Sequence, residues 1–94
     1  MNDIHFSWDN SKASLNKRKH GVSFEEAQTV FYDENAIEYF DPDHSDDEDR
    51  FIMLGFSFKL RMLIVCYCAR KVNTIRIISA RKATRHEADN YRKG

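Results

Sequence analysis

Residues 62–80 read MLIVCYCARKVNTIRIISA, and this stretch decides the fold. Residues 62–68 are apolar at every position, which predicts a central strand covered on both faces. Residues 70–73 turn the chain, and the alternation over residues 74–80 predicts a second strand. Because the connection between them is short, we expect the two strands to pair antiparallel.

Two further strands are predicted upstream of this stretch. The first covers residues 36–40 and is broken by Asp41-Pro42-Asp43, since proline cannot continue a strand interior. An acidic loop follows to Asp49, and residues 50–57 form the next strand. The pattern therefore predicts a four-stranded antiparallel sheet.

Two helices are predicted before the sheet. Asp9 or Asn10 can cap a helix over residues 11–20, and Gly21 ends it as a residue that tolerates the left-handed conformation. A second helix begins after Ser23, which forms a capping box with Glu26. Val22 and Ala27 are spaced for the hydrophobic staple that often precedes such a helix, and both helices together make a short hairpin.

A final helix is predicted after the sheet. Thr84 and Glu87 form another capping box, with Ala88 and Tyr91 facing inward. The element order α-α-β-β-β-β-α gives an α+β fold with two N-terminal helices, an antiparallel sheet and a C-terminal helix. We expect residues 1–94 to form a single domain, as is usual at this length.

The composition favours a cytoplasmic protein without a cofactor. The longest apolar run, residues 62–69, is far shorter than the ~20 residues of a membrane helix. There is no export signal, and the two cysteines, Cys66 and Cys68, are expected to be reduced and to serve as small core residues.

The formal net charge of zero hides two segments of opposite sign. Residues 32–50 hold nine acids and one base, namely Asp33, Glu34, Glu38, Asp41, Asp43, Asp46, Asp47, Glu48 and Asp49 against Arg50. Residues 70–94 hold eight bases and two acids, namely Arg70, Lys71, Arg76, Arg81, Lys82, Arg85, Arg92 and Lys93 against Glu87 and Asp89. Either these charges form salt bridges across the surface, or the basic part makes a phosphate-binding face.

The acidic loop invites a calcium interpretation, which its spacing does not support. A loop of the EF-hand type beginning at Asp41 requires glycine at its sixth position and glutamate at its twelfth. Those positions hold Asp46 and Ile52, and His44 is the loop's only nitrogen ligand. We therefore expect a solvated loop, or one that docks a basic partner, and no metal site.

Arg76 is the unusual residue of the last strand. Alternation places it on one face with Thr74, Ile78 and Ala80. A guanidinium in mid-strand needs an anion, which could be an acid such as Glu38 on a neighbouring strand. Alternatively, Arg76 and Arg81 point into a cleft and bind a phosphate.

Lys17, Arg18, Lys19 and His20 occupy the last turn of the first predicted helix. Cations there are favoured by the negative end of the helix dipole, so this cluster has a purely structural explanation. Histidine is nevertheless a common general acid or base, so His20 could transfer a proton.

Three stretches of the chain together resemble the BrnT family, the toxins of BrnT–BrnA type II toxin–antitoxin pairs. They are FSWDNSKASLNKRKHGVSFEEAQTVFYD, DPDHSDDEDRFIMLG and IRIISARKATRHEADNY. The shared marks are Trp8-Asp9, Lys19-His20-Gly21, Phe24, Ala27, Arg50-Phe51, Gly55 and Ser79-Ala80-Arg81.

The resemblance implies a RelE-like fold and a ribonuclease that cuts RNA and stops translation. It also implies a ribbon-helix-helix antitoxin resembling BrnA, with operator DNA bound only through the toxin–antitoxin complex. Carried over by motif, the catalytic candidates are Lys19, His20, Arg50, Arg76 and Arg81. In such a reaction the ribose 2′-OH attacks its own phosphate, fixed cations stabilise the charge, and Lys19 or His20 moves a proton.

Two other functions fit the sequence. The chain could be a non-catalytic module that joins the antitoxin and tunes repression of the operon. The basic C-terminal third could also bind DNA directly, although it lacks an obvious recognition helix with base-reading side chains.

Overall fold

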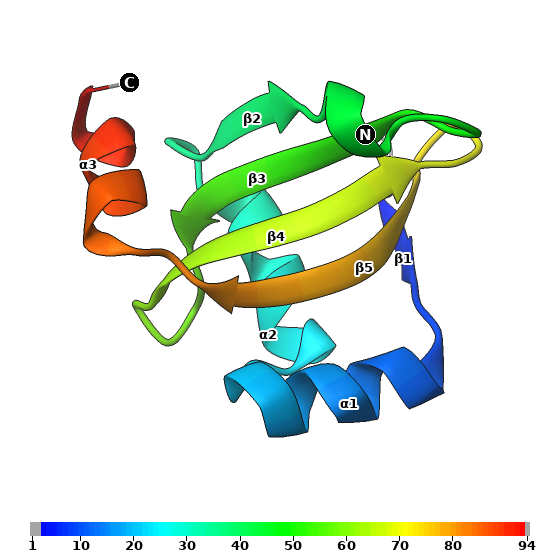
Figure 1. Ribbon diagram of the computed structural model, residues 1–94, viewed down its shortest axis with the longest axis horizontal. Helices are drawn as coiled ribbons and strands as arrows, with labels where there is room; N and C mark the ends of the chain where they lie inside the picture. Colours follow the sequence, from blue (N-terminus) through cyan, green and yellow to red (C-terminus); the bar gives the residue numbers. More distant parts are fainter. Residues whose placement is uncertain (1–2, 94) are drawn as a thin grey trace.

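The computed structural model describes residues 3–93 and shows a sheet with helices on both sides (Figure 1). Its helical elements are α1 (Asn10–His20), α2 (Phe24–Thr29) and α3 (Arg85–Lys93), with short 3₁₀ turns η1 (Val30–Tyr32) and η2 (Pro42–His44). The strands are β1 (His5–Ser7), β2 (Ile37–Phe40), β3 (Arg50–Phe56), β4 (Met62–Ala69) and β5 (Thr74–Lys82). Within the described range none of the helices is long and apolar enough to span a membrane.

The sheet is mixed and has five strands in the order β1-β5-β4-β3-β2 over residues 3–93. The prediction of four antiparallel strands is correct for β2 to β5, and β4 is central as expected. It is wrong for the sheet as a whole, because β1 adds a fifth strand parallel to β5. A strand of three residues is too short to show a period in the sequence, which explains the omission.

A β-bulge in β5 reverses the predicted alternation. Cys66 pairs with Ser79, whereas the next residue, Tyr67, pairs with Ile77, so Ile78 is the extra residue. As a result Ala80 is buried against α2, whereas Arg76 lies on the opposite face. The prediction that Arg76 and Ala80 share a face is therefore wrong.

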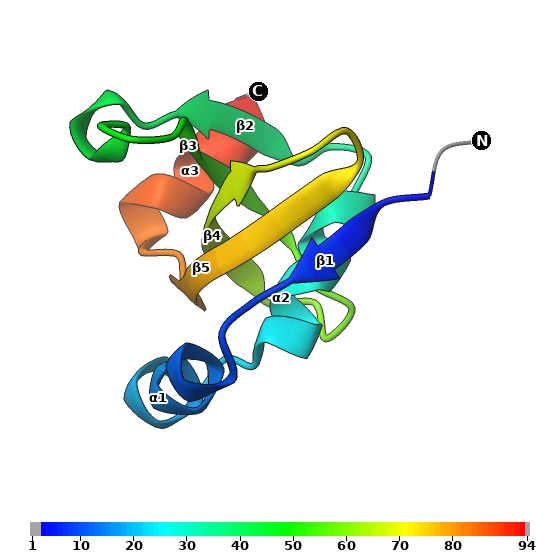
Figure 2. The same cartoon turned by 90° about the vertical axis from the view of Figure 1, so that its right-hand side faces the viewer.

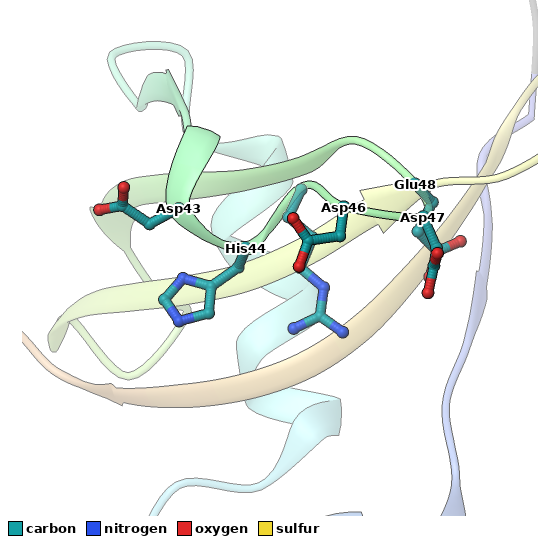
Figure 3. A pocket seen from close by; sticks show the side chains of 6 residues that line it. Asp43, His44, Asp46, Asp47 and Glu48 are labelled. Carbon is teal, nitrogen blue, oxygen red and sulfur yellow. The ribbon is translucent and has the colours of Figure 1, made fainter.

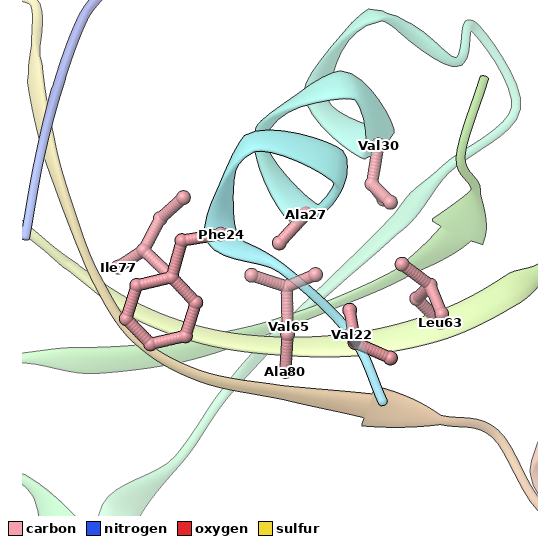
Figure 4. Packing of buried hydrophobic residues seen from close by; sticks show 8 residues of the cluster. All are labelled: Val22, Phe24, Ala27, Val30, Leu63, Val65, Ile77 and Ala80. Atoms are coloured by element: carbon pink, nitrogen blue, oxygen red, sulfur yellow. The ribbon is translucent and has the colours of Figure 1, made fainter. Parts of the chain in front are cut away.

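One face of the sheet packs against α2 and forms the core (Figure 4). The helical side contributes Val22, Phe24, Ala27 and Val30, and the strands contribute Leu63, Val65, Ile77 and Ala80, all at most 2% exposed. Each of the larger side chains gains roughly 1.5–3 kcal/mol from burial. The predicted pairing of Val22 with Ala27 before α2 agrees with their shared place in this cluster.

The helix α1 runs along the part of β5 that β1 leaves uncovered. Asn16 makes this contact, since its Nδ2 donates to the carbonyls of Ala80 (2.8 Å) and Val22 (2.9 Å). Its Oδ1 accepts from the Ala80 N–H (3.1 Å). One buried amide thus satisfies the backbone groups that an edge strand would otherwise leave unpaired.

The predicted helix ends are mostly confirmed. Asp9 accepts from the Lys12 N–H, Gly21 adopts a left-handed φ of 70°, and Thr84 and Glu87 form a complete capping box. At α2 only half of the box forms, because Ser23 caps the Glu26 N–H but the Glu26 carboxylate turns away to Arg61.

The face of β3, β4 and β5 opposite α2 is called the outer face here. Figure 2 shows α3 on this side of the sheet and α2 on the other. The loop between β2 and β3 also lies on the side of α3 (Figure 2). The outer face is therefore bordered by α1, α3 and the acidic loop.

Candidate active site

The outer face carries a row of residues that includes two of the predicted arginines. Arg50 of β3 pairs in register with Cys68 of β4, and Cys68 pairs with Arg76 of β5. Residues directly opposite one another on neighbouring strands share a face. With strands about 4.8 Å apart, the Cα atoms of Arg50 and Arg76 are roughly 10 Å apart.

Arg81 lies on the same face near the other end of β5. Arg81 pairs with Ile64. Ser79, two residues earlier in β5, pairs with Cys66. The neighbour between them, Ala80, points into the core, so Ser79 and Arg81 both project from the outer face. The Arg81 side chain remains 41% exposed.

The end of α1 adds the two remaining candidates. A cavity of about 180 Å³ lies between α1 and β5, and its lining includes Lys19, His20 and Ser79. Since Ser79 shares a face with Arg81, the end of α1 and the end of β5 border the same region (Figure 1). The cavity is smaller than the pockets that enclose drug-sized ligands.

The four basic residues at the end of α1 divide into two pairs. Lys19 and His20 line the cavity beside β5, whereas Lys17 and Arg18 line a separate groove. That groove has a volume of about 760 Å³, lies between α1 and α2, and also contains Trp8. The helix period explains the split, because residues three or four positions apart share a face.

Arg81 forms an ion pair with Glu87 at the start of α3. Its Nη1 donates to Glu87 Oε1 (2.7 Å) and its Nη2 donates to Oε2 (2.8 Å). The same carboxylate accepts from the Thr84 N–H (2.8 Å). The hydrogen bonds from Arg81 are the main reason why the pKa of Glu87 falls to about 2. The pair therefore stays fully ionised at neutral pH.

These positions lie inside a family match. A family model described as "Ribonuclease toxin, BrnT, of type II toxin-antitoxin system" matches residues 8–87. The chain belongs to the BrnT family. The resemblance inferred from the sequence is thus confirmed, and membership assigns the chain to the ribonuclease toxins, with an RNA target and an antitoxin partner.

A solved BrnT structure has the same fold. The 1.1 Å crystal structure of the Brucella abortus ribonuclease toxin BrnT aligns with a TM-score of 0.67 and 20% sequence identity. The alignment covers 87% of this chain and 99% of the other. At this identity the likeness shows the fold alone. A search of curated protein sequences finds no match.

Within this BrnT fold, Arg50 differs from the other candidates because it lies beneath the acidic loop. A cavity of about 290 Å³ is lined by Arg50 together with Asp43, His44, Asp46, Asp47 and Glu48 (Figure 3). The loop is held at one end by His44, which contacts Asp41 (2.9 Å), and at the other by Glu48, which pairs with Arg70 (3.0 Å). These carboxylates repel phosphate on this side of the outer face, whereas α1 attracts it.

The proposed pairing of Arg76 with Glu38 is wrong. Glu38 instead accepts a hydrogen bond from the Tyr67 hydroxyl, and burial of Tyr67 together with this carboxylate raises the pKa of the phenol. Arg76 instead interacts with the charge of Asp9. The Lys12 N–H is the main cause of the lowered pKa of Asp9, and Arg76 adds to it.

Three residues at the site were not predicted from the sequence. Ser79 lines the cavity, Asn16 fixes α1 on β5, and Glu87 binds Arg81. The sequence pattern identified Glu87 only as a capping residue, because its contact with Arg81 depends on how α3 packs after β5. Over residues 3–93 no three histidine, cysteine or acidic side chains are grouped as metal ligands.

Proposed function

We propose that this chain is a metal-independent RNA endonuclease that inhibits translation, and that RNA binds across the outer face. The observation that carries the proposal is the shared position of the end of α1 and the end of β5. Lys19 and His20 line a cavity with Ser79, and Ser79 projects from the same face as Arg81. This arrangement supports one phosphate site built from two distant segments.

In the proposed reaction the ribose 2′-oxygen forms a bond to the adjacent phosphorus, and the bond from phosphorus to the 5′-oxygen breaks. The products are a 2′,3′-cyclic phosphate and a 5′-hydroxyl. Arg81 and Arg76 stabilise the charge that develops on the phosphate oxygens. Lys19 or His20 accepts the 2′-OH proton or donates one to the leaving 5′-oxygen.

Arg50 has a smaller role in this proposal. Its side chain is half-buried under the acidic loop, and it belongs to the same cross-strand row as Arg76. We assign it to binding a phosphate next to the one that reacts. The acidic loop limits how far RNA extends in that direction.

The partner of this activity is proposed to be a ribbon-helix-helix antitoxin that resembles BrnA. In this proposal the toxin reaches operator DNA only through that complex. The basic side of the outer face is the surface that such an antitoxin has to cover in order to block RNA.

The test is cleavage of a fluorescently labelled single-stranded RNA with EDTA present, and analysis of the product ends. We expect cyclic phosphate ends, no cleavage of an RNA in which every 2′-OH is replaced by hydrogen, and a ~100- to 1,000-fold loss in Arg81→Ala. Lys19→Ala should lose activity. Lys17→Ala should retain most of it, because Lys17 lies on another face of α1 and lines the other groove.

Two outcomes would contradict the proposal. Parent-like cleavage by folded Lys19→Ala and Arg81→Ala variants would refute the assigned residues. Purified protein that binds its antitoxin but leaves RNA intact, with and without ribosomes, would instead favour a non-catalytic binding module.

A further inference from the structure

Arg81 uses the terminal edge of its guanidinium in its ion pair. Nη1 and Nη2, the two terminal nitrogens, bind the two oxygens of Glu87. Nη1 also donates to the carbonyl oxygen of Lys82 (3.2 Å). These contacts account for three of the five N–H groups that a guanidinium carries.

The two remaining donors are the Nε–H and the second N–H of Nη2. They lie on one edge of the planar group and point in parallel, and residues 3–93 provide no hydrogen-bond partner for them. Two parallel donors of this kind match two oxygens of a phosphate. The free edge is thus a preformed fork for an anion.

The other arginine–glutamate pairs of the described chain leave no such fork. Arg61 donates from Nε to Glu26 Oε2 (2.9 Å) and from Nη2 to Oε1. Arg70 donates from Nη2 to Glu48 Oε1 (3.1 Å), and its Nε lies 3.0 Å from Glu48 Oε2. Both carboxylates occupy the edge that is free in Arg81.

We propose that Glu87 is a positioning residue for the ribonuclease reaction: it holds the terminal edge of Arg81 and thereby presents the Nε edge to the RNA phosphate. This inference rests on the proposed function of the outer face. Glu87 touches Arg81 and not the RNA.

Glu87 is itself well placed for this purpose. Its backbone N–H donates to Thr84 Oγ1 (3.1 Å), and its carboxylate accepts from the Thr84 N–H. It also lies in the first turn of α3, where a negative charge is favoured by the helix dipole. Two hydrogen bonds with Thr84, one to the carboxylate and one from the backbone, therefore hold Glu87 where it contacts Arg81.

The kinetic test compares Glu87→Ala, Glu87→Gln and Tyr91→Phe with the parent on a labelled single-stranded RNA. We expect Glu87→Ala to lower kcat about 10- to 100-fold, because a displaced guanidinium no longer meets the transition state. KM should rise less than twofold, since the positive charge remains. Glu87→Gln keeps one acceptor oxygen and should recover part of kcat.

Tyr91→Phe is the matched control. It removes the hydrogen bonds from Tyr91 to Asp33 (2.9 and 3.1 Å) that hold α3, without touching Arg81. The proposal predicts that its kcat equals that of the parent. An equal loss in Tyr91→Phe and Glu87→Ala would show that Glu87 only anchors α3, and a higher kcat in Glu87→Ala would show that Glu87 inhibits Arg81. Either result overturns the proposal.

A second readout does not depend on cleavage. In NMR spectra of ¹⁵N-labelled protein, adding the RNA with 2′-hydrogen substitutions should shift the Nε–H signal of Arg81 and leave that of Arg61 unchanged. In Glu87→Ala the same addition should give a weaker shift. No shift at Arg81 in the parent refutes the free-edge proposal, whereas a shift without RNA cleavage refutes the ribonuclease proposal alone.

Discussion

The Arg61–Glu26 and Arg81–Glu87 pairs join the same two chemical groups and have different consequences. Glu26 is 1% exposed, and its carboxylate also accepts from the Ser57 hydroxyl (2.6 Å). The pair connects α2 to the turn between β3 and β4, and Arg61 also donates to the Gly21 carbonyl (3.1 Å). Glu87 is 29% exposed, and its arginine lies at the candidate site.

The two pairs therefore differ in burial and in the edge of the guanidinium that binds the carboxylate. A buried carboxylate without a cationic partner destabilises the folded state, so the role of Arg61 is structural. A more exposed pair contributes little to stability, so Arg81 can serve another anion.

The strongest test of the comparison is Glu26→Ala. We expect a loss of about 3 kcal/mol in the free energy of unfolding, because Arg61 and Ser57 lose their partner in a buried place. In a domain of this size that loss lowers Tm by about 15 °C. Thermal denaturation followed by circular dichroism measures it, and Glu25→Ala is the control because Glu25 is exposed. A Tm change of equal size in both variants would contradict the structural role assigned to Glu26.

Replacing each arginine by lysine should give opposite results at the two positions. Lysine keeps the charge but cannot bind two oxygens with parallel donors. We expect Arg61→Lys to lose roughly 1–2 kcal/mol of stability, as for a lost charged hydrogen bond, and to keep its rate of RNA cleavage. Arg81→Lys should keep its Tm and lose at least about tenfold in kcat. If both variants changed stability and rate together, the division of roles would be wrong.

Acidic pH should lower the stability of the parent protein more than that of the Glu87→Gln variant. The pKa of Glu87 is about 2, below its ordinary value of 4.5, mainly because Arg81 donates to it. A carboxyl with a lowered pKa stabilises the fold above pH 4.5, and this contribution is lost as pH falls towards 2, since the unfolded chain binds the proton first. Solvent screening limits the effect to roughly 1 kcal/mol.

The measurement is Tm from pH 6 to pH 2 for both proteins. Three other carboxyls also have lowered pKa values: Glu26 because of Arg61, Asp33 because of the N–H donors of Phe56 and Asn35, and Asp9 because of the Lys12 N–H. The parent curve therefore contains all four groups. The Glu87→Gln curve should fall less steeply below pH 4.5. Parallel curves would mean that the ion pair contributes nothing to stability.

The smallest expected effect is that of salt on the two pairs. Raising NaCl from 0.05 to 0.5 M screens exposed charges more than buried ones. In double-mutant cycles the coupling of Arg81 with Glu87 should fall by a few tenths of a kcal/mol. The coupling of Arg61 with Glu26 should stay constant, and a decrease of equal size there would indicate that water reaches that pair.

Local sequence patterns predicted most of the fold but not the contacts between distant segments. The apolar run of β4, the break at Pro42 and the Thr84–Glu87 box each have a local physical cause, and all three agree with the structure. The bulge at Ile78 has no such signal, so the alternation of β5 was assigned to the wrong face.

The candidate site shows the same division. Alternation and family motifs identified Lys19, His20, Arg50, Arg76 and Arg81, and their catalytic roles remain predictions. The sequence could not show that Lys17 and Lys19 line different cavities, or that Glu26 leaves its capping box for Arg61. Such contacts depend on tertiary packing, which no short window of sequence contains.

The amide of Asn16 links α1 to β5 by hydrogen bonds to the backbone of Ala80. Lys19 and His20 follow within a turn of that residue, and Arg81 follows directly after its partner Ala80. Substitutions at position 16 should therefore change the toxicity of the protein in steps without altering any charged group. Asn16→Ala, which loses the three hydrogen bonds of the amide and adds no charge, would be a natural starting point for an attenuated toxin that a cell tolerates without its antitoxin.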